Sequence, residues 1–180
     1  MRKTTKMILS ALFAALTALG AFLQIPTFGS AFTLQILFTG MAGCLLGRRW
    51  GAVSQLIYVL LGIAGLPIFT GGGGPGALIH PTGGFLIGMI GMAWICGWIT
   101  EKWGSSFSVA CLACSAGLAA LYLLGLPWMH LVMTVYHKSW TLRTTLVSGM
   151  LLFLPWDLVK IAVTALLCAR LRPALYHTSL

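Results

Sequence analysis

The sequence predicts an all-α integral membrane protein with six transmembrane helices and with both termini on the cytoplasmic side. Of its 180 residues, 59% are hydrophobic, 7% are charged and only two are acidic. A soluble domain carries roughly 25% charged residues, because its surface must face water. So few charges indicate a surface that faces lipid. The length suits one compact bundle, so residues 1–180 are expected to form a single transmembrane domain.

The first three apolar runs each end at a clear signal. A spanning helix needs about 20 predominantly apolar residues, and residues 5–24 meet this requirement before a proline interrupts the pattern. A short uncharged loop leads to the second expected helix, residues 33–47, which stops at the pair Arg48-Arg49. The third expected helix, residues 50–65, ends just before another proline.

The last three runs follow a glycine-rich stretch at residues 70–76. The fourth expected helix covers residues 82–100 and stops at a Glu-Lys pair. The fifth covers residues 107–126 and is expected to end there, because proline at the next position cannot continue the hydrogen-bond ladder. A mixed segment, residues 128–143, then leads to the sixth expected helix, residues 146–167.

The positions of the basic residues predict the orientation. Cytoplasmic loops carry an excess of Lys and Arg. With the N-terminus inside, 8 of the 11 basic residues fall on the inner side: Arg2, Lys3, Lys6, Arg48, Arg49, Lys102, Arg170 and Arg172. The outer loops hold only Lys138 and Arg143. This spacing explains the net charge of +9 without nucleic acid as a partner, and it predicts a multi-pass protein of a cytoplasmic membrane.

Two ionisable residues lie near the centre of the sixth apolar run. Each of Asp157 and Lys160 alone would cost about 2.5–3.5 kcal/mol at the bilayer centre on insertion scales. Their i, i+3 spacing puts them on one helical face, where they partly neutralise each other. Pro155 removes a helix hydrogen bond just before them. The pair either holds the bundle together or forms a polar functional site, and intramembrane charges favour the second interpretation.

The glycine run Gly71–Gly74 is a second candidate site. Glycine lets the backbone approach a ligand and exposes amide donors, so Gly72, Gly73 and Gly74 are candidate contacts. No Lys-Ser or Lys-Thr follows the run, which excludes a nucleotide P-loop. Phe69 precedes the run, and Thr82 begins the next helix, whose N-terminus favours a carboxylate. The alternative is a flexible outer loop.

Two further pairs of residues have open roles. Thr33 and Gln35 lie at the outer end of the second expected helix, where their side chains either hydrogen-bond a ligand or cap the helix. Ala11 and Ala15 place small side chains on one face of the first helix. Such a face lets another helix approach closely, either inside the bundle or on a partner membrane protein.

The sequence gives little sign of catalytic or metal chemistry. No histidine pair has metal-ligand spacing, and the two carboxylates are too far apart to act as an acid/base pair. Cys111 and Cys114 form a C-x-x-C, but without a second pair it indicates packing. No metal and no cofactor is expected. An enzyme is not expected either, and the absence of an ATP-binding motif means that energy must come from a partner or a gradient.

Four segments together resemble the BioY family, the biotin-binding membrane subunits of energy-coupling-factor transporters. The segment MILSALFAALTALGAFLQIP resembles the family's opening helix, and FTLQILFTGMAGCLLG carries its FTLQ motif. The most specific segment is YVLLGIAGLPIFTGGGGPGALIHPTGGFLIG. LPWDLVKI resembles the family's Pro-x-Asp-x-x-Lys in the last helix. The resemblance covers nearly the full length of the chain.

The resemblance implies a six-helix subunit that captures biotin from outside with high affinity. Such subunits dock laterally on a transmembrane coupling subunit, and two cytoplasmic ATPases drive delivery. In the family, the Asp and Lys of the last helix lie at the biotin site, which implies this role for Asp157 and Lys160. The sequence departs from the family at Trp156, where a small residue is common, and at His80, where glycine is common. Both positions lie near the implied pocket.

The implied site suits the chemistry of biotin. A carboxylate such as Asp157 can accept hydrogen bonds from the ureido N–H groups, and the Lys160 ammonium can donate to the ureido carbonyl. The valerate carboxylate would point toward the glycine amides and Thr82. Three alternatives remain: a subunit of the same architecture for riboflavin or thiamine, a small membrane enzyme that acts on lipids, and a structural membrane protein. The Asp-x-x-Lys and FTLQ patterns favour biotin.

Overall fold

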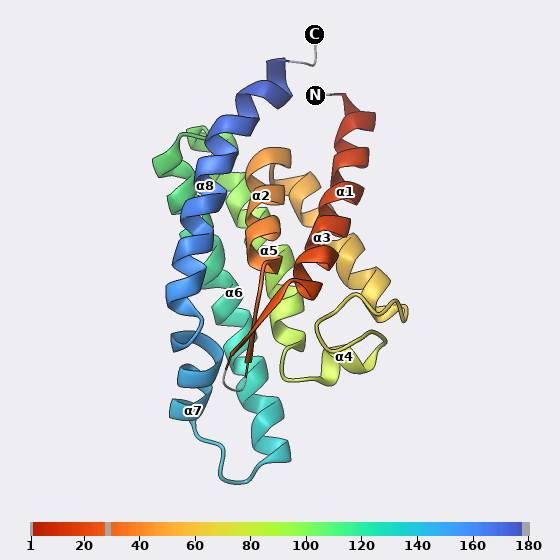
Figure 1. Ribbon diagram of the computed structural model, residues 1–180, viewed down its shortest axis with the longest axis vertical. Helices are drawn as coiled ribbons and strands as arrows, with labels where there is room; N and C mark the ends of the chain where they lie inside the picture. The colour runs from red at the N-terminus through yellow and green to blue at the C-terminus, as the bar shows by residue number, and fades with distance from the viewer. Residues whose placement is uncertain (1, 28–29, 178–180) are drawn as a thin grey trace.

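The computed structural model, which describes residues 2–27 and 30–177, is an elongated bundle of helices (Figure 1). Its helices are α1 (Lys3–Phe22), α2 (Gln35–Leu46), α3 (Arg48–Ile63), α4 (Gly76–Ile79), α5 (Gly83–Trp103), α6 (Phe107–Tyr136), α7 (Leu142–Leu146), the π-helical turn η1 (Val147–Leu151) and α8 (Leu154–His177). Strands β1 (Gln24–Thr27) and β2 (Ser30–Thr33) form an antiparallel hairpin between α1 and α2.

Every apolar run that the sequence shows forms a helix. Within the part of the chain that the structure describes, four helical segments are long and apolar enough to cross a membrane by length and composition: Lys3–Phe22, Gly83–Trp103, Phe107–Tyr136 and Leu142–Leu175. The helices α2 and α3 are shorter, with 12 and 16 residues. Large apolar side chains are exposed along α1, α6 and α8. These features identify a multi-pass membrane protein.

The expected end of the fifth helix before Pro127 is wrong. Helix α6 continues through Pro127 to Tyr136 and includes the first part of the segment expected to be mixed. A proline inside a helix removes one hydrogen bond and strains the preceding turn. Packing on α5 compensates for this beyond the proline, because Trp128 lies directly against Gly84, which has no side chain to obstruct it.

The sixth expected helix is longer than predicted and is interrupted. It begins at Leu142 with α7 and ends at His177 with α8, instead of covering residues 146–167. The π-helical turn and a short non-helical turn separate α7 from α8. Pro155 therefore lies in the first turn of α8, where backbone N–H groups have no intrahelical partner and a proline costs little. The interruption places Asp157 in the first turn of α8.

Small residues bring the central helices into close contact. A side chain at Gly43 of α2 would collide with the backbone of α5 at Ala93, and one at Gly97 of α5 would collide with the backbone at Arg48. Polar side chains link the same region, since the Gln55 amide of α3 bonds Thr39 of α2 and Thr17 of α1. Membrane helices associate through such close packing and interhelical hydrogen bonds.

The two ends of the bundle differ. The start of α1 and the end of α8 lie at the end where Arg48 forms an ion pair with Glu101, with 3.4 Å between Nε and Oε2 (Figure 1). The β1–β2 hairpin, α4 and α7 lie toward the opposite end (Figure 1). The segment that was expected to be a short uncharged loop is thus this hairpin, with Gln24 paired to Thr33. The candidate site lies beside these elements.

Candidate functional site

A cavity of about 530 Å³ lies among the hairpin, the glycine-rich segment, α5, α6, η1 and α8. Its volume falls in the range of small-molecule sites. Among the residues that line it are seven that the sequence predicts as substrate contacts: Thr33, Gln35, Phe69, Gly72, Gly73, Thr82 and Asp157. These residues come from four separate stretches of the chain. Apolar side chains, including Phe85, Leu86 and Met89, form much of the remaining wall.

Asp157 is fully buried and has two side-chain donors. The Lys160 Nζ lies 2.8 Å from its Oδ1, and the Tyr122 hydroxyl donates to its Oδ2 at 2.6 Å. The carboxylate also lies in the first turn of α8, where the helix dipole favours negative charge. A carboxylate has about four lone-pair positions, so this one retains capacity to accept hydrogen bonds from a ligand in the cavity.

Lys160 does not line the cavity, although its ion pair with Asp157 does place it next to the site. Its relative exposure is 8%, and it lies one turn further along α8. In this arrangement the ammonium neutralises and orients the carboxylate. To donate a hydrogen bond directly to a ligand, the Lys160 side chain would need to adopt another conformation.

A second group of polar side chains surrounds Gln35. Its amide Nε2 donates to the Tyr58 hydroxyl at 2.8 Å, and its Oε1 accepts from the Thr33 hydroxyl at 3.0 Å. The Tyr58 hydroxyl in turn donates to the Ile68 carbonyl at 3.1 Å. The N-terminus of α2 has no side-chain cap at Leu34. Thr33 therefore serves to hold Gln35 at the cavity wall, and this network fixes the orientation of the amide.

The glycine-rich segment is folded against the bundle. Phe69 and Gly72 exchange backbone hydrogen bonds at 2.9 and 3.0 Å, and the Gly74 amide donates to the Gly62 carbonyl at 2.7 Å. The amides of Gly72 and Gly74 are thus used within the protein. A side chain at Gly73 would collide with the Leu66 carbonyl. The segment is therefore an ordered wall that requires glycine.

The remaining predicted residues lie in other positions. Gly74 and Trp156 do not line the cavity. Trp156 is 49% exposed, and its ring centroid lies 5.6 Å from that of Phe32. Ala11 and Ala15 are both exposed on α1. Their small side chains are therefore not part of the packing inside the bundle.

Sequence reasoning missed Tyr122, which lines the cavity and binds the carboxylate directly. It lies within the fifth apolar run, without a recognisable motif. The available signal is a phenol in the middle of an apolar helix, because a buried hydroxyl needs a hydrogen-bond partner. Phe153 and Met129 also line the cavity and were not predicted, since apolar side chains there resemble any other core residue.

The cysteines that lie together in the structure are not the two of the C-x-x-C pattern. Cys114 lies with Cys44 and Cys96, and the three Sγ atoms are all within 4.8 Å of one another. The Sγ atoms of Cys44 and Cys114 are 3.8 Å apart. Three thiols this close could hold a soft metal ion, a possibility that sequence spacing did not reveal because they come from α2, α5 and α6. All three are buried in the packed interior, away from the cavity.

Comparison with known proteins identifies the family to which the chain belongs. A family model described as the BioY family matches residues 1–177. The chain is 40% identical over 147 residues to a probable biotin transporter BioY of Lysinibacillus sphaericus, covering 78% of this chain and 74% of the relative. It is 36% identical over 168 residues to the biotin transporter BioY of Thermotoga maritima, covering 93% and 95%.

A solved structure shows the same fold. It is described as the S-component for biotin from an ECF-type ABC transporter, and it superposes with a TM-score of 0.81 at 26% sequence identity. The match covers 95% of this chain and 92% of the other. The family resemblance that the four sequence segments indicate is thereby confirmed, and the chain belongs to the BioY family.

Proposed function

We propose that this chain is the biotin-capture subunit of an energy-coupling-factor transporter and functions in biotin uptake. Two kinds of similarity support this: relatives that are named biotin transporters, and a solved S-component for biotin. The observation that carries the proposal is a buried carboxylate, Asp157, at the wall of a 530 Å³ cavity. Lys160 and Tyr122 hold it in place.

The cavity suits the two ends of biotin. The ureido N–H groups donate to Asp157, which is oriented by its two donors and has remaining lone pairs. The apolar ring and valerate chain pack against Phe69, Phe85 and Met89, which line the same space. The valerate carboxylate lies toward Thr82 at the N-terminus of α5, where helix amides and the helix dipole favour an anion.

The other predicted site residues have supporting roles in this proposal. Gln35 and Thr33 supply a fixed amide and hydroxyl at the second polar region of the wall. Gly73 lets the backbone approach the ligand, and Gly72 and Gly74 shape the segment that carries it. Trp156 packs on Phe32 outside the cavity and thereby helps to position the hairpin.

The topology proposal is six spans with cytoplasmic termini, with the whole chain acting as one substrate-binding unit. The helices α1, α2, α3, α5 and α6 and the interrupted segment from α7 to α8 correspond to the six apolar runs, and the start of α1 and the end of α8 lie at one end (Figure 1). That end carries most of the basic residues, in agreement with the positive-inside rule. The cavity then opens toward the outside. Ala11 and Ala15 on α1 form the docking face for a transmembrane coupling subunit, and two cytoplasmic ATPases supply the energy.

Calorimetric titration of the purified protein with biotin, riboflavin and thiamine tests the proposed ligand. Biotin should bind at a 1:1 ratio, and the other two vitamins should give no heat of binding. If riboflavin or thiamine bound and biotin gave no heat of binding, the proposed ligand would be wrong, although the proposed architecture would stand.

A further inference from the structure

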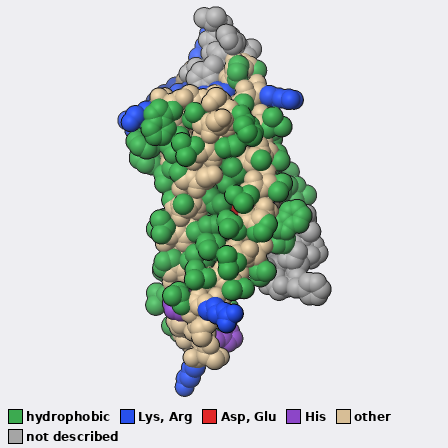
Figure 2. Space-filling model, turned by 90° about the vertical axis from the view of Figure 1, so that its left-hand side faces the viewer, with side chains coloured by type: hydrophobic (Ala, Val, Ile, Leu, Met, Phe, Trp, Pro, Cys, Tyr) green, Lys and Arg blue, Asp and Glu red, His purple; other side chains and the backbone are tan. Residues whose placement is uncertain are grey.

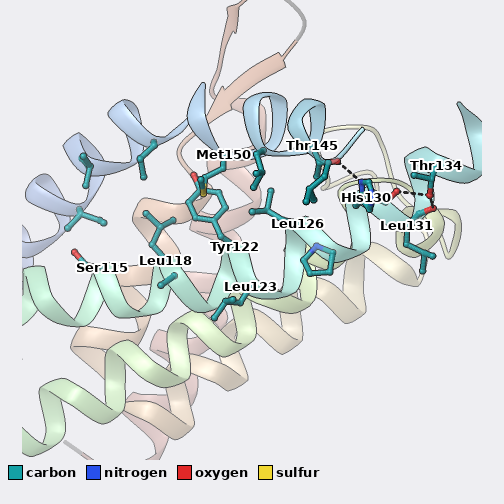
Figure 3. A pocket seen from close by; sticks show the side chains of 17 residues that line it. Ser115, Leu118, Tyr122, Leu123, Leu126, His130, Leu131, Thr134, Thr145 and Met150 are labelled. Atoms are coloured by element: carbon teal, nitrogen blue, oxygen red, sulfur yellow. Dashed lines mark hydrogen bonds between the residues drawn. The ribbon is translucent and has the colours of Figure 1, made fainter. Parts of the chain in front are cut away.

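A second hollow lies outside the proposed biotin site. It is a groove of about 1070 Å³ between α6 and the segment formed by α7, η1 and α8 (Figure 3). Leu118 and Ile161 form its buried floor, and exposed leucines such as Leu123 and Leu158 form its rim. Tyr122 lines both this groove and the cavity, so its ring separates the two spaces.

The groove is long enough to hold an acyl chain. On α6 its lining extends from Ser115 to Thr134, which corresponds to a rise of about 28 Å along the helix. The hydrocarbon core of a bilayer is about 30 Å thick. The groove therefore runs along the apolar depth of the membrane, and its open side faces lipid tails and not water. Left unfilled, its walls would lose dispersion contacts.

One end of the groove is polar, whereas its middle is apolar. His130, Thr134 and Thr145 lie at the end away from the termini. The His130 Nδ1 lies 2.9 Å from the Thr145 hydroxyl, and the Thr134 hydroxyl donates to the His130 carbonyl (Figure 3). In a bilayer, the ester groups and headgroups of lipids meet the hydrocarbon core at a similar boundary between polar and apolar groups.

Positive charge lies just beyond this polar end. Lys138 is exposed in the segment that joins α6 to α7, and Arg143 is exposed in α7 itself. Figure 2 shows an apolar face with basic and histidine side chains gathered near its lower end. The two acidic residues of the chain do not compensate this charge, since Glu101 lies at the opposite end and Asp157 is buried with Lys160. An anionic group of another molecule therefore meets no competing carboxylate of the described residues at these two side chains.

We propose that this groove binds a phospholipid with an anionic headgroup. One acyl chain lies between α6 and α8, and the headgroup phosphate contacts Arg143 and Lys138. In the orientation proposed above, the lipid belongs to the outer leaflet. The bound chain packs on the outer side of the Tyr122 ring, which lines both spaces.

Photo-crosslinking in nanodiscs tests this site. The protein is reconstituted with phosphatidylglycerol or phosphatidylcholine that carries a diazirine in one acyl chain, and labelled peptides are mapped by mass spectrometry. Labels should concentrate on α6 and α8 along the groove, with more label from phosphatidylglycerol. Even labelling of all exposed apolar faces by both lipids would overturn the proposal. A dimer in which the groove residues carry no label would also overturn it, because a second copy of the chain would then occupy the groove.

Matched variants separate the headgroup from the chain. Arg143→Glu should reduce groove labelling by phosphatidylglycerol about fivefold, as loss of one basic contact predicts, whereas Arg49→Glu at the opposite end should have no effect. Ala119→Trp fills the groove and should reduce labelling by both lipids, whereas Leu112→Trp, on α6 outside the groove, should not. Unchanged labelling in both groove variants would refute the site.

Biotin titration of each variant separates a failure of the lipid site from a failure of the proposed function. Arg143 and Ala119 do not line the cavity, so the variants should keep biotin affinity and thereby report a folded protein. A variant that binds biotin normally and still labels like the parent counts against the lipid site alone. A parent protein that labels as expected and ignores biotin counts against the proposed function alone.

Discussion

At the scale of single residues, the stability of the buried Asp157 carboxylate depends on its neighbours. The residue is fully buried, and an isolated charge there would be costly. Lys160, the Tyr122 hydroxyl and the first turn of α8 together compensate the charge. Buried ion pairs are often no more stabilising than apolar replacements. A site that keeps both charges beside a cavity is therefore better explained by ligand binding than by stability.

Removing one member of this pair should destabilise the protein. Lys160→Met leaves the Asp157 charge with one side-chain donor fewer, and breaking a buried pair in this way costs about 3–5 kcal/mol. Thermal unfolding of the purified protein in detergent should show a clearly lower Tm. Adding Asp157→Asn to this variant should recover part of the loss, because the uncompensated charge disappears.

The control for this prediction is Lys3→Met, which removes an exposed lysine in the first turn of α1. Its Tm should match that of the parent protein. If Lys160→Met also unfolds at the parental temperature, the ion pair does not hold the carboxylate in the way that the structure indicates.

At the scale of elements, the glycine-rich segment forms a fixed wall because several of its positions exclude side chains. Gly72 and Gly74 have φ values of 110° and 103°, which L side chains rarely adopt. A side chain at Gly62 on α3 would collide with the Phe69 ring, which lines the cavity. The sequence therefore needs glycine for the shape of the wall, in addition to any role of the amides.

Two glycines provide a matched test of this wall. Gly73→Ala should weaken biotin binding on the order of tenfold, because the new methyl group collides with the Leu66 carbonyl and the segment must shift, and a shift that costs about 1.4 kcal/mol of binding free energy is tenfold in Kd. Gly91→Ala, on α5 outside the cavity, meets its nearest neighbour at an ordinary contact distance of 3.8 Å and should bind as the parent does. Calorimetric titration measures both. Equal affinities for the two variants would show that the segment does not shape the site.

The elements also show which sequence signals were sufficient. The apolar runs predicted the helices because lipid exposure requires long apolar segments. Pro127 predicted the end of a helix. Helix α6 continues past it, because Trp128 packs on Gly84. The π-helical turn had no signal, since it depends on Gly149 packing against Leu126 and Met129 of α6. The hairpin was missed because its strands are only four residues long.

At the scale of the whole molecule, the fold brings distant motifs around one cavity. Motif segments near Gln35, Phe69, Thr82 and Asp157 meet there because α2, α5 and α8 pack side by side and the segments between helices cover the same end. Family motifs could indicate these residues. Tyr122 could not be identified in this way, because only the packing of α6 beside α8 places its hydroxyl 2.6 Å from Asp157.

The outer face of α1 gives a prediction about assembly. Ala11→Trp and Ala15→Trp place bulky side chains on an exposed face that small residues now leave open. Both variants should keep biotin binding but should lose biotin uptake in cells that express the coupling subunit and ATPases. Leu112→Trp changes a lipid-facing residue of α6 and should keep both. Full uptake by the alanine variants would exclude this face as the docking surface.

The most direct test of the central claim is the biotin affinity of Asp157→Asn, with Glu101→Gln as the matched control. These are the two acidic residues of the chain, and only Asp157 lines the cavity. Loss of charge-assisted hydrogen bonds worth about 1.5–3 kcal/mol predicts at least about a tenfold weaker Kd for Asp157→Asn. Glu101→Gln should keep the parental Kd. Parental affinity in Asp157→Asn would contradict a biotin site built on this carboxylate.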